Sequence, residues 1–240
     1  MNTVFDEAFL AIPILRLHPS FLPFVGSEYE RYRVLHVGES HYIDNEAYDI
    51  QYFQKWWDSP CEEVEREFAG WFTRPVIERY MSNAQGSYTI FSNFLKSFCR
   101  CVLHEEVSIC PEVKKRYEYL AFMNFFQMPS LYPVTKYWDS LVRSAEKAGN
   151  SQLAYDMWEI ACNNAAKTLD SVIDILKPRA VVITSISAGN AYKEFGGRHA
   201  DSIIFTSHPA YPYTWQKPLK SLDGQKGVDV CEAGLRRIFG

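Results

Sequence analysis

Four short apolar segments predict the strands of a buried sheet. β-Branched and aromatic side chains are concentrated in these segments, which is typical of strands that are covered on both faces. The segments are residues 33–37, 119–125, 180–184 and 202–206. Because the connections between them are long enough to hold crossover helices, we expect these strands to be mostly parallel.

Helical periodicity fills most of the chain between and after these strands. Apolar residues recur at helical spacing in residues 62–81, 90–102, 137–148, 152–176, 187–195 and 228–238. Pro75 should kink or split the first of these segments, and Pro178 should end the fourth. The alternation predicts an α/β fold: a three-layer α/β/α sandwich around a mostly parallel, four-stranded sheet.

The length of 240 residues fits one α/β domain, and no linker or internal repeat divides the chain. We therefore predict a single domain over residues 1–240. Residues 1–32 contain three prolines among apolar residues and should form an irregular segment packed on the domain. Residues 44–118 match no assigned pattern, and we interpret them as a helical insertion that shapes a pocket.

Two polar clusters occur where predicted strands end. The segment VLHVGESHY (residues 34–42) and the segment IIFTSHPAYPYTW (residues 203–215) both pass from an apolar strand into a polar turn. Ligand crevices of open α/β sheets form at the carboxyl ends of the strands. Candidate chemistry is therefore expected at residues 38–42 and 208–213.

Charge and cysteine content restrict the classes of partner and site. A net charge of −4 argues against broad electrostatic binding to a polyanion. The six cysteines lack the paired spacing of zinc or iron–sulfur sites, so we predict no metal cluster. We find no signal-type leader in residues 1–14 and no apolar run of membrane-spanning length. Free thiols fit a reducing compartment, which predicts a cytoplasmic protein with no membrane partner.

The order of the motifs resembles the uracil-DNA glycosylase superfamily. In that family a strand leads into GQDPY, GEAPG or a relative, a second strand ends in Asn, and a last strand leads into an HPS-like motif. Here the corresponding elements are GESHY (residues 38–42), Asn124 and HPAYPY (residues 208–213). The resemblance implies a uracil-DNA glycosylase-like fold, cleavage of the N-glycosidic bond of uracil or a damaged base, and DNA as the partner. It implies no cofactor, because the base leaves as a stabilised anion.

The resemblance assigns roles to the first motif position by position. Gly38 matches a glycine that allows close approach of the backbone, and Glu39 could orient water or offset positive charge on a sugar. Ser40 stands where one branch of the family has its water-activating aspartate, and a hydroxyl is a poor general base. His41 could supply that base, since an ordinary histidine is largely neutral at cellular pH. Tyr42, or a ring from residues 52–57, would stack on the base; core packing is the alternative for Tyr42.

The later motifs receive recognition roles from the same resemblance. Asn124 would read the edge of a pyrimidine, because a carboxamide both donates and accepts; an ordinary turn is the alternative. His208 would donate to a pyrimidine oxygen as negative charge develops there. Pro209, Tyr211 and Tyr213 belong to a loop that would contact DNA or fold back over the sheet edge.

The sequence leaves two further interpretations open. The first keeps the fold without turnover and treats the protein as a module that binds a nucleic acid or a nucleotide, because Ser40 replaces the aspartate. The second is an esterase that uses Glu39 and His41, since Gly-Glu-Ser-His also resembles the motif of erythromycin-esterase-like hydrolases. A serine hydrolase is disfavoured, because no G-x-S-x-G turn surrounds Ser40.

Overall fold

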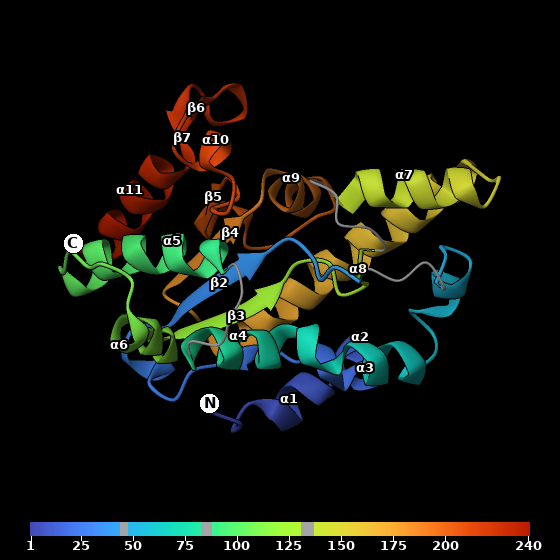
Figure 1. Cartoon of the computed structure of the whole chain (residues 1–240), viewed down its shortest axis with the longest axis horizontal. Helices are drawn as coiled ribbons and strands as arrows, with labels where there is room; N and C mark the ends of the chain where they lie inside the picture. The colour runs from blue at the N-terminus through green and yellow to red at the C-terminus, as the bar shows by residue number, and fades with distance from the viewer. Residues whose placement is uncertain (44–47, 83–87, 131–136) are drawn as a thin grey trace.

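The computed structural model describes residues 1–43, 48–82, 88–130 and 137–240. Its centre is a five-stranded sheet, and Figure 1 shows helices packed around these strands. The strands lie in the order β1-β3-β2-β4-β5. All neighbours are parallel except β1 and β3, which pair antiparallel. The strand bounds are β1 Phe24–Val25, β2 Val34–Gly38, β3 Leu120–Asn124, β4 Ala180–Thr184 and β5 Ile203–Thr206.

The prediction of four strands was wrong, because it omitted β1. This strand has two residues, directly after Pro23, and pairs with one edge of the sheet. A two-residue strand is too short to show an alternating pattern, and a preceding proline is more typical of a turn. The four parallel strands coincide closely with the predicted segments, so the α/β class and the mostly parallel sheet are confirmed.

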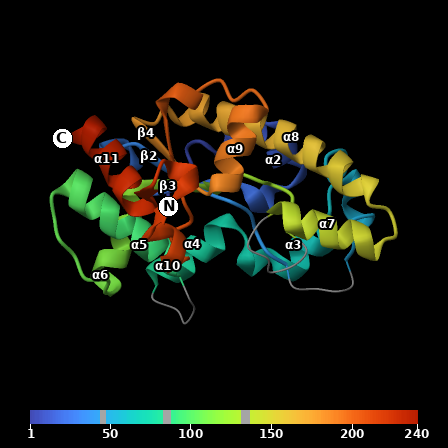
Figure 2. The same cartoon turned by 90° about the horizontal axis from the view of Figure 1, so that it is seen from above.

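Helices cover both faces of the sheet, which gives three layers. Figure 2 shows α8 and α9 on one side of the strands and α4 and α5 on the other. The first face carries α1 (Asp6–Leu10), α2 (Pro13–Leu17), α3 (Glu62–Phe68), α7 (Tyr137–Lys147), α8 (Gln152–Leu176) and α9 (Ile186–Glu194). The second face carries α4 (Thr73–Met81), α5 (Thr89–Phe98), α6 (Pro111–Lys114), the short α10 (Pro212–Trp215) and α11 (Gly227–Phe239).

Alternation along each strand builds two apolar cores from one sheet. In β2, the side chains of Leu35 and Val37 join the core beneath α8, whereas Val34 joins the core beneath α5. All five residues of β2 are buried. A strand buried on both faces has a nearly continuous apolar sequence, which is why these strands were recognisable from the sequence.

The segment 44–118 is largely helical where it is described; residues 44–47 and 83–87 lie outside the described part. The predicted helix over 62–81 divides at Phe72, and Pro75 lies in the first turn of α4, where a proline is tolerated. α5 continues into a π-helical turn at Cys99–Leu103. The remaining short elements are 3₁₀ turns at Pro19–Phe21, Tyr29–Arg31, Tyr52–Lys55, Ala69–Trp71, Lys115–Tyr119, Ala200–Ser202 and Lys220–Leu222, and a hairpin of β6 (Pro218–Leu219) with β7 (Gln225–Lys226).

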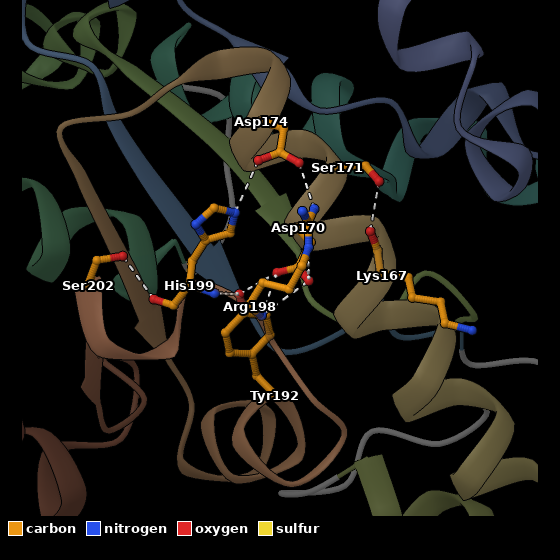
Figure 3. A network of polar contacts seen from close by, with 8 residues as sticks. All are labelled: Lys167, Asp170, Ser171, Asp174, Tyr192, Arg198, His199 and Ser202. Carbon is orange, nitrogen blue, oxygen red and sulfur yellow. Dashed lines mark hydrogen bonds and ion pairs between the residues drawn. The ribbon is translucent and has the colours of Figure 1, made fainter.

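A buried carboxylate links α8, α9 and the connection to β5 (Figure 3). Asp170 accepts a hydrogen bond from the Tyr192 hydroxyl at 2.5 Å and further bonds from the backbone and guanidinium of Arg198. Arg198 and His199 also bind Asp174. This network fixes α9 and the connection to β5 against α8.

The described residues contain no helix long and apolar enough to cross a membrane. In the same part of the chain, no group of three His, Cys, Asp or Glu side chains is arranged to hold a metal ion. All six cysteines are free thiols.

Candidate functional site

The strand order places a crevice between the carboxyl ends of β2 and β4. From β2 the chain crosses over to β3, and from β4 it crosses over to β5 on the other side, so the direction of winding reverses between these two neighbours. Ligands of doubly wound sheets bind at such a reversal. Glu39 follows β2, Ser185 follows β4, and the Ser185 hydroxyl donates to Glu39 Oε2 at 2.6 Å.

The Glu39 carboxylate is buried and held by donors from two elements. The backbone N–H of Tyr137, at the start of α7, donates to Oε1 at 2.7 Å. Ser185 donates to the other oxygen and also caps α9, accepting from the Ala188 N–H at 3.1 Å. An ionised carboxylate accepts hydrogen bonds and cannot donate them, so these bonds match its charged form. Glu39 is thus fixed in orientation beside the N-terminus of a helix.

Backbone hydrogen bonds hold the first motif in an extended conformation beyond β2. The N–H groups of Phe125 and Phe126 donate to the carbonyls of Gly38 and Glu39, both at 2.9 Å. Farther along, the Ser130 N–H donates to the His41 carbonyl at 2.6 Å. The GESHY segment therefore continues alongside the residues that follow β3, and this pairing aligns the two motifs.

Gly38 and Asn124 are neighbours in the register of β2 and β3. A Cβ atom built on Gly38 would lie 2.3 Å from Oδ1 of Asn124, closer than van der Waals contact allows. A larger residue at position 38 would therefore displace the Asn124 carboxamide. Within the described residues that carboxamide makes no hydrogen bond, so its donors and acceptor are available to a ligand.

His208 follows β5 and presents one defined tautomer. The backbone N–H of Ala210 donates to its Nδ1 at 3.2 Å, so Nδ1 is an acceptor and the proton resides on Nε2. Burial lowers the pKa of His208 to about 4, which keeps the ring neutral at physiological pH. The turn is anchored by Asn93 of α5, whose amide donates to the Pro209 carbonyl at 2.8 Å.

The side chains of Glu39, Asn124 and His208 converge on one cavity of about 330 Å³, which we call the small cavity. All three line it, although they come from the carboxyl ends of three different strands. Its other polar lining residues are Ser40, His41 and Thr73, and its apolar walls are Tyr42, Trp71, Val76, Tyr88, Ile90, Phe91 and Phe122. A volume at the lower end of the range of ligand pockets suits a small planar molecule.

His41 lines the small cavity but is unsuited to the predicted role of general base. Its Nε2 pairs with the Thr73 hydroxyl at 3.2 Å, and the ring also bonds the backbone of Trp71. Burial lowers its pKa to about 3, against the opposing effect of the Trp71 bond. A group with so low a pKa accepts a proton poorly at neutral pH. Edge-on contacts with Phe21 and Phe72 indicate a packing role instead.

Ser40 and Tyr42 provide hydroxyl groups at the same cavity. The Ser40 hydroxyl is buried beside the Tyr42 phenol and is in hydrogen-bond geometry with no group among the described residues. Burial and the nearby Glu39 raise the pKa of Tyr42, so its hydroxyl stays protonated. Each hydroxyl can therefore bond a ligand, and the Tyr42 ring forms part of the wall.

A larger cavity of about 650 Å³ lies next to the small one, and Glu39 and His208 line both. Its aromatic walls come from Trp138 and Trp158 together with Tyr211 and Tyr213 of the last loop. We call it the large cavity. Tyr211 and Tyr213 were predicted to contact DNA or fold over the sheet edge, and they form one wall of this space.

The remaining predicted residues support the site or lie away from it. Gly38 leaves the space that the Asn124 side chain occupies. Pro209 accepts the hydrogen bond from Asn93 that anchors the turn after β5. The rings of residues 52–57 do not line the small cavity among the described residues: Phe53 is buried, and Trp56 stacks on His18 at 3.7 Å. The stacking role predicted for those rings therefore gains no support from the lining of the small cavity.

Several residues at the candidate site were not predicted from the sequence. The sequence could have indicated the position of Ser185, because a serine directly after a strand and before a helix is typical of an N-cap. No sequence pattern indicates a role for Asn93, Trp71 or Trp138. Each lies in an ordinary helical or irregular segment, and only the fold brings it to the site.

Comparison with known proteins gives no match: no family model, no curated protein and no solved structure is similar to this chain. The geometry of the site alone therefore indicates what it can bind.

Proposed function

We propose that this protein binds a pyrimidine base, extruded from nucleic acid, in the small cavity and cleaves its N-glycosidic bond, in the manner of the uracil-DNA glycosylase superfamily. The observation that carries the proposal is the convergence of Glu39, Asn124 and His208 on one aromatic-walled space. An enzyme that acts on a base must take that base out of the stack and read its edge.

Recognition would come from Asn124 and His208. The Asn124 carboxamide offers a donor pair and an acceptor, which suit the alternating edge of uracil. The neutral His208 ring offers the Nε2–H donor, with its tautomer set by Ala210. The faces of the base would contact aromatic walls such as Tyr42 and Phe91.

Catalysis would depend on electrostatic stabilisation at both ends of the breaking bond. As the bond between the sugar C1′ and the base nitrogen breaks, its electron pair leaves with the base, where Asn124 and His208 donate to the developing anion. Glu39, between the two cavities, stabilises the positive charge on the sugar. Water then adds to C1′ and releases a proton to solvent. No step requires His41 as a base.

A second candidate is base binding without turnover, and two observations favour it. Ser40 stands at the aspartate position of one family branch, and the low pKa of His41 removes the substitute base. The esterase reading gains no such support, because the hydrogen bonds of His41 go to Thr73 and Trp71.

A base-release assay with purified protein separates the two candidates. Single- and double-stranded oligonucleotides that contain one deoxyuridine would be incubated with the wild-type chain and with Glu39→Gln. Release of uracil that falls in the variant supports the glycosylase. Tight binding with no release by either protein supports the binding module, and neither binding nor release rejects both.

A further inference from the structure

The large cavity has no role in the proposed function, and its lining indicates what would occupy it. Four aromatic side chains contribute to its walls: Trp138, Trp158, Tyr211 and Tyr213. Trp138 and Trp158 pack edge to face with ring centroids 5.5 Å apart, which makes that wall rigid. Flat aromatic walls favour a planar group, because ring stacking contributes to binding regardless of the identity of the base.

The charges of the large cavity argue against an anionic group inside it. Among the described residues, its lining contains two carboxylates, Glu39 and Glu194, and no lysine or arginine. A phosphate placed between them would be repelled and would lack a cationic partner. At the rim, the ammonium group of Lys217 lies 4.5 Å from the ring centre of the exposed Tyr213. Phosphate would therefore be accommodated at this rim and not within the cavity.

The position of the cavity links its occupant to the base. Glu39 and His208 line both cavities, so a ligand that extends from the small cavity into the large one passes these two side chains. Glu39 and His208 therefore form the shared polar border, and Ser185, which lines the large cavity, donates to Glu39 there. A sugar fits this border, since it joins a base on one side to a second group on the other.

We infer that the two cavities together hold two successive planar rings joined through a sugar and a phosphodiester, with the base in the small cavity and its neighbour in the large one. This inference rests on the proposed function and specifies its substrate: two unpaired neighbouring bases, as in a dinucleotide or a single strand. A paired duplex would keep the neighbouring base in its own stack and leave the large cavity unused.

The test compares ligands of increasing size by titration calorimetry. The ligands are 2′-deoxyuridine, a dinucleotide of deoxyuridine and deoxyadenosine, and a single-stranded decamer with one deoxyuridine, with 2′-fluorinated sugars at the uracil to slow cleavage. The dinucleotide should bind about tenfold or more tightly than the nucleoside, the gain expected from stacking one ring. The decamer should add little, and its salt dependence should have a slope of about −0.7 or less steep, which corresponds to one phosphate contact.

Two variants and a control locate the second ring. Ser187→Trp would fill the large cavity from α9 and should reduce dinucleotide affinity to that of the nucleoside, and Trp138→Ala should act in the same direction by removing a wall. Ser171→Trp makes the same change on α8, away from both cavities, and should alter nothing. If the nucleoside binds but the dinucleotide binds no more tightly, or if Ser187→Trp leaves the gain intact, the inference is overturned. If no ligand binds, the proposed function fails first.

Discussion

Gly38 leaves the space that the Asn124 side chain occupies. The two residues are aligned in the register of β2 and β3, and a Cβ at position 38 would lie 2.3 Å from Asn124 Oδ1. The glycine of the first motif and the asparagine of the second are therefore one structural unit. This relationship explains why a buried strand ends in glycine at this position.

Replacing Gly38 by alanine should impair ligand binding more than stability. The new methyl group displaces the end of a flexible side chain, so we expect a loss of only about 1 kcal/mol in the free energy of unfolding. The displaced carboxamide should reduce affinity for deoxyuridine at least tenfold. Denaturant unfolding and calorimetry of Gly38→Ala measure both quantities. Gly70→Ala is the control, because a Cβ there meets its nearest neighbour at 3.8 Å. Unchanged affinity in Gly38→Ala would contradict the role of Asn124.

Neutralising Glu39 should reduce turnover without abolishing binding. In Glu39→Gln the side chain keeps its size, but the charge that we propose stabilises a sugar cation is lost. Removal of one such electrostatic contact lowers the rate roughly 10²- to 10³-fold in well-studied enzymes. Ser185→Ala, which leaves the charge of Glu39 in place but removes one of its donors and the N-cap of α9, should have a smaller effect on the rate. Single-turnover base release checks both, and equal rates for wild type and Glu39→Gln would count against the mechanism.

The buried histidines should make the fold sensitive to mild acid. Burial lowers the pKa of His41 to about 3 and that of His36 well below its ordinary value. Unfolding restores a pKa near 6.5, so below that pH the unfolded chain takes up protons that the folded chain does not bind. Stability is therefore complete above about pH 6.5 and decreases as the pH falls, by about 1.4 kcal/mol per pH unit for each such histidine.

Urea unfolding between pH 7 and pH 5 measures this slope. His41→Gln removes one titrating group and should flatten the dependence by about one proton. A slope that is identical in wild type and variant would show that His41 is protonated in the folded state.

The affinity for deoxyuridine should not show the pH dependence that a catalytic histidine base would give. The neutral His208 ring, with its pKa lowered to about 4 by burial, keeps its tautomer down to that pH. We expect deoxyuridine affinity to stay constant between pH 8 and about pH 5.5, where the fold is intact. An acid limb with a midpoint near pH 6.5 would contradict this assignment. His208→Gln, which keeps a donor, should retain more affinity than His208→Ala.

The Asp170 network should contribute measurably to stability. Tyr192→Phe removes the hydroxyl that donates to the buried carboxylate at 2.5 Å. Hydrogen bonds to charged groups are worth about 1.5–3 kcal/mol, so we expect a loss of that size in the free energy of unfolding. Tyr155→Phe is the matched control, because Tyr155 is largely exposed on α8. A loss below about 0.5 kcal/mol would show that the network is replaceable by water.

The parts of the fold with strong periodicity were predictable from the sequence. The helix at Gln152–Leu176 and the strand at Ala180–Thr184 have the predicted bounds, because an apolar stripe and a β-branched run each satisfy one pattern only. The strand β1, with two residues, and the π-helical turn at Cys99–Leu103 have no such pattern. Their conformations depend on the neighbours that tertiary packing supplies.

The candidate site likewise contains residues that the sequence predicts and residues that it does not. Residues at the ends of strands, such as Asn124, and directly after them, such as Glu39, could be found because parallel strands end at one edge of the sheet. The walls could not, because Trp71 and Trp138 come from segments whose path over the sheet no local pattern specifies. The low pKa of His41 was equally hidden, since burial by Phe21 and Phe72 is a tertiary property.

The most direct test of the account is a crystal structure of the protein with 2′-fluoro-2′-deoxyuridine. The account predicts the uracil ring in the small cavity, with its edge within hydrogen-bond distance of the Asn124 carboxamide and of His208 Nε2, and with the sugar beside Glu39. A ring bound at saturation elsewhere on the molecule, or a small cavity filled by its own side chains, would contradict the central claim.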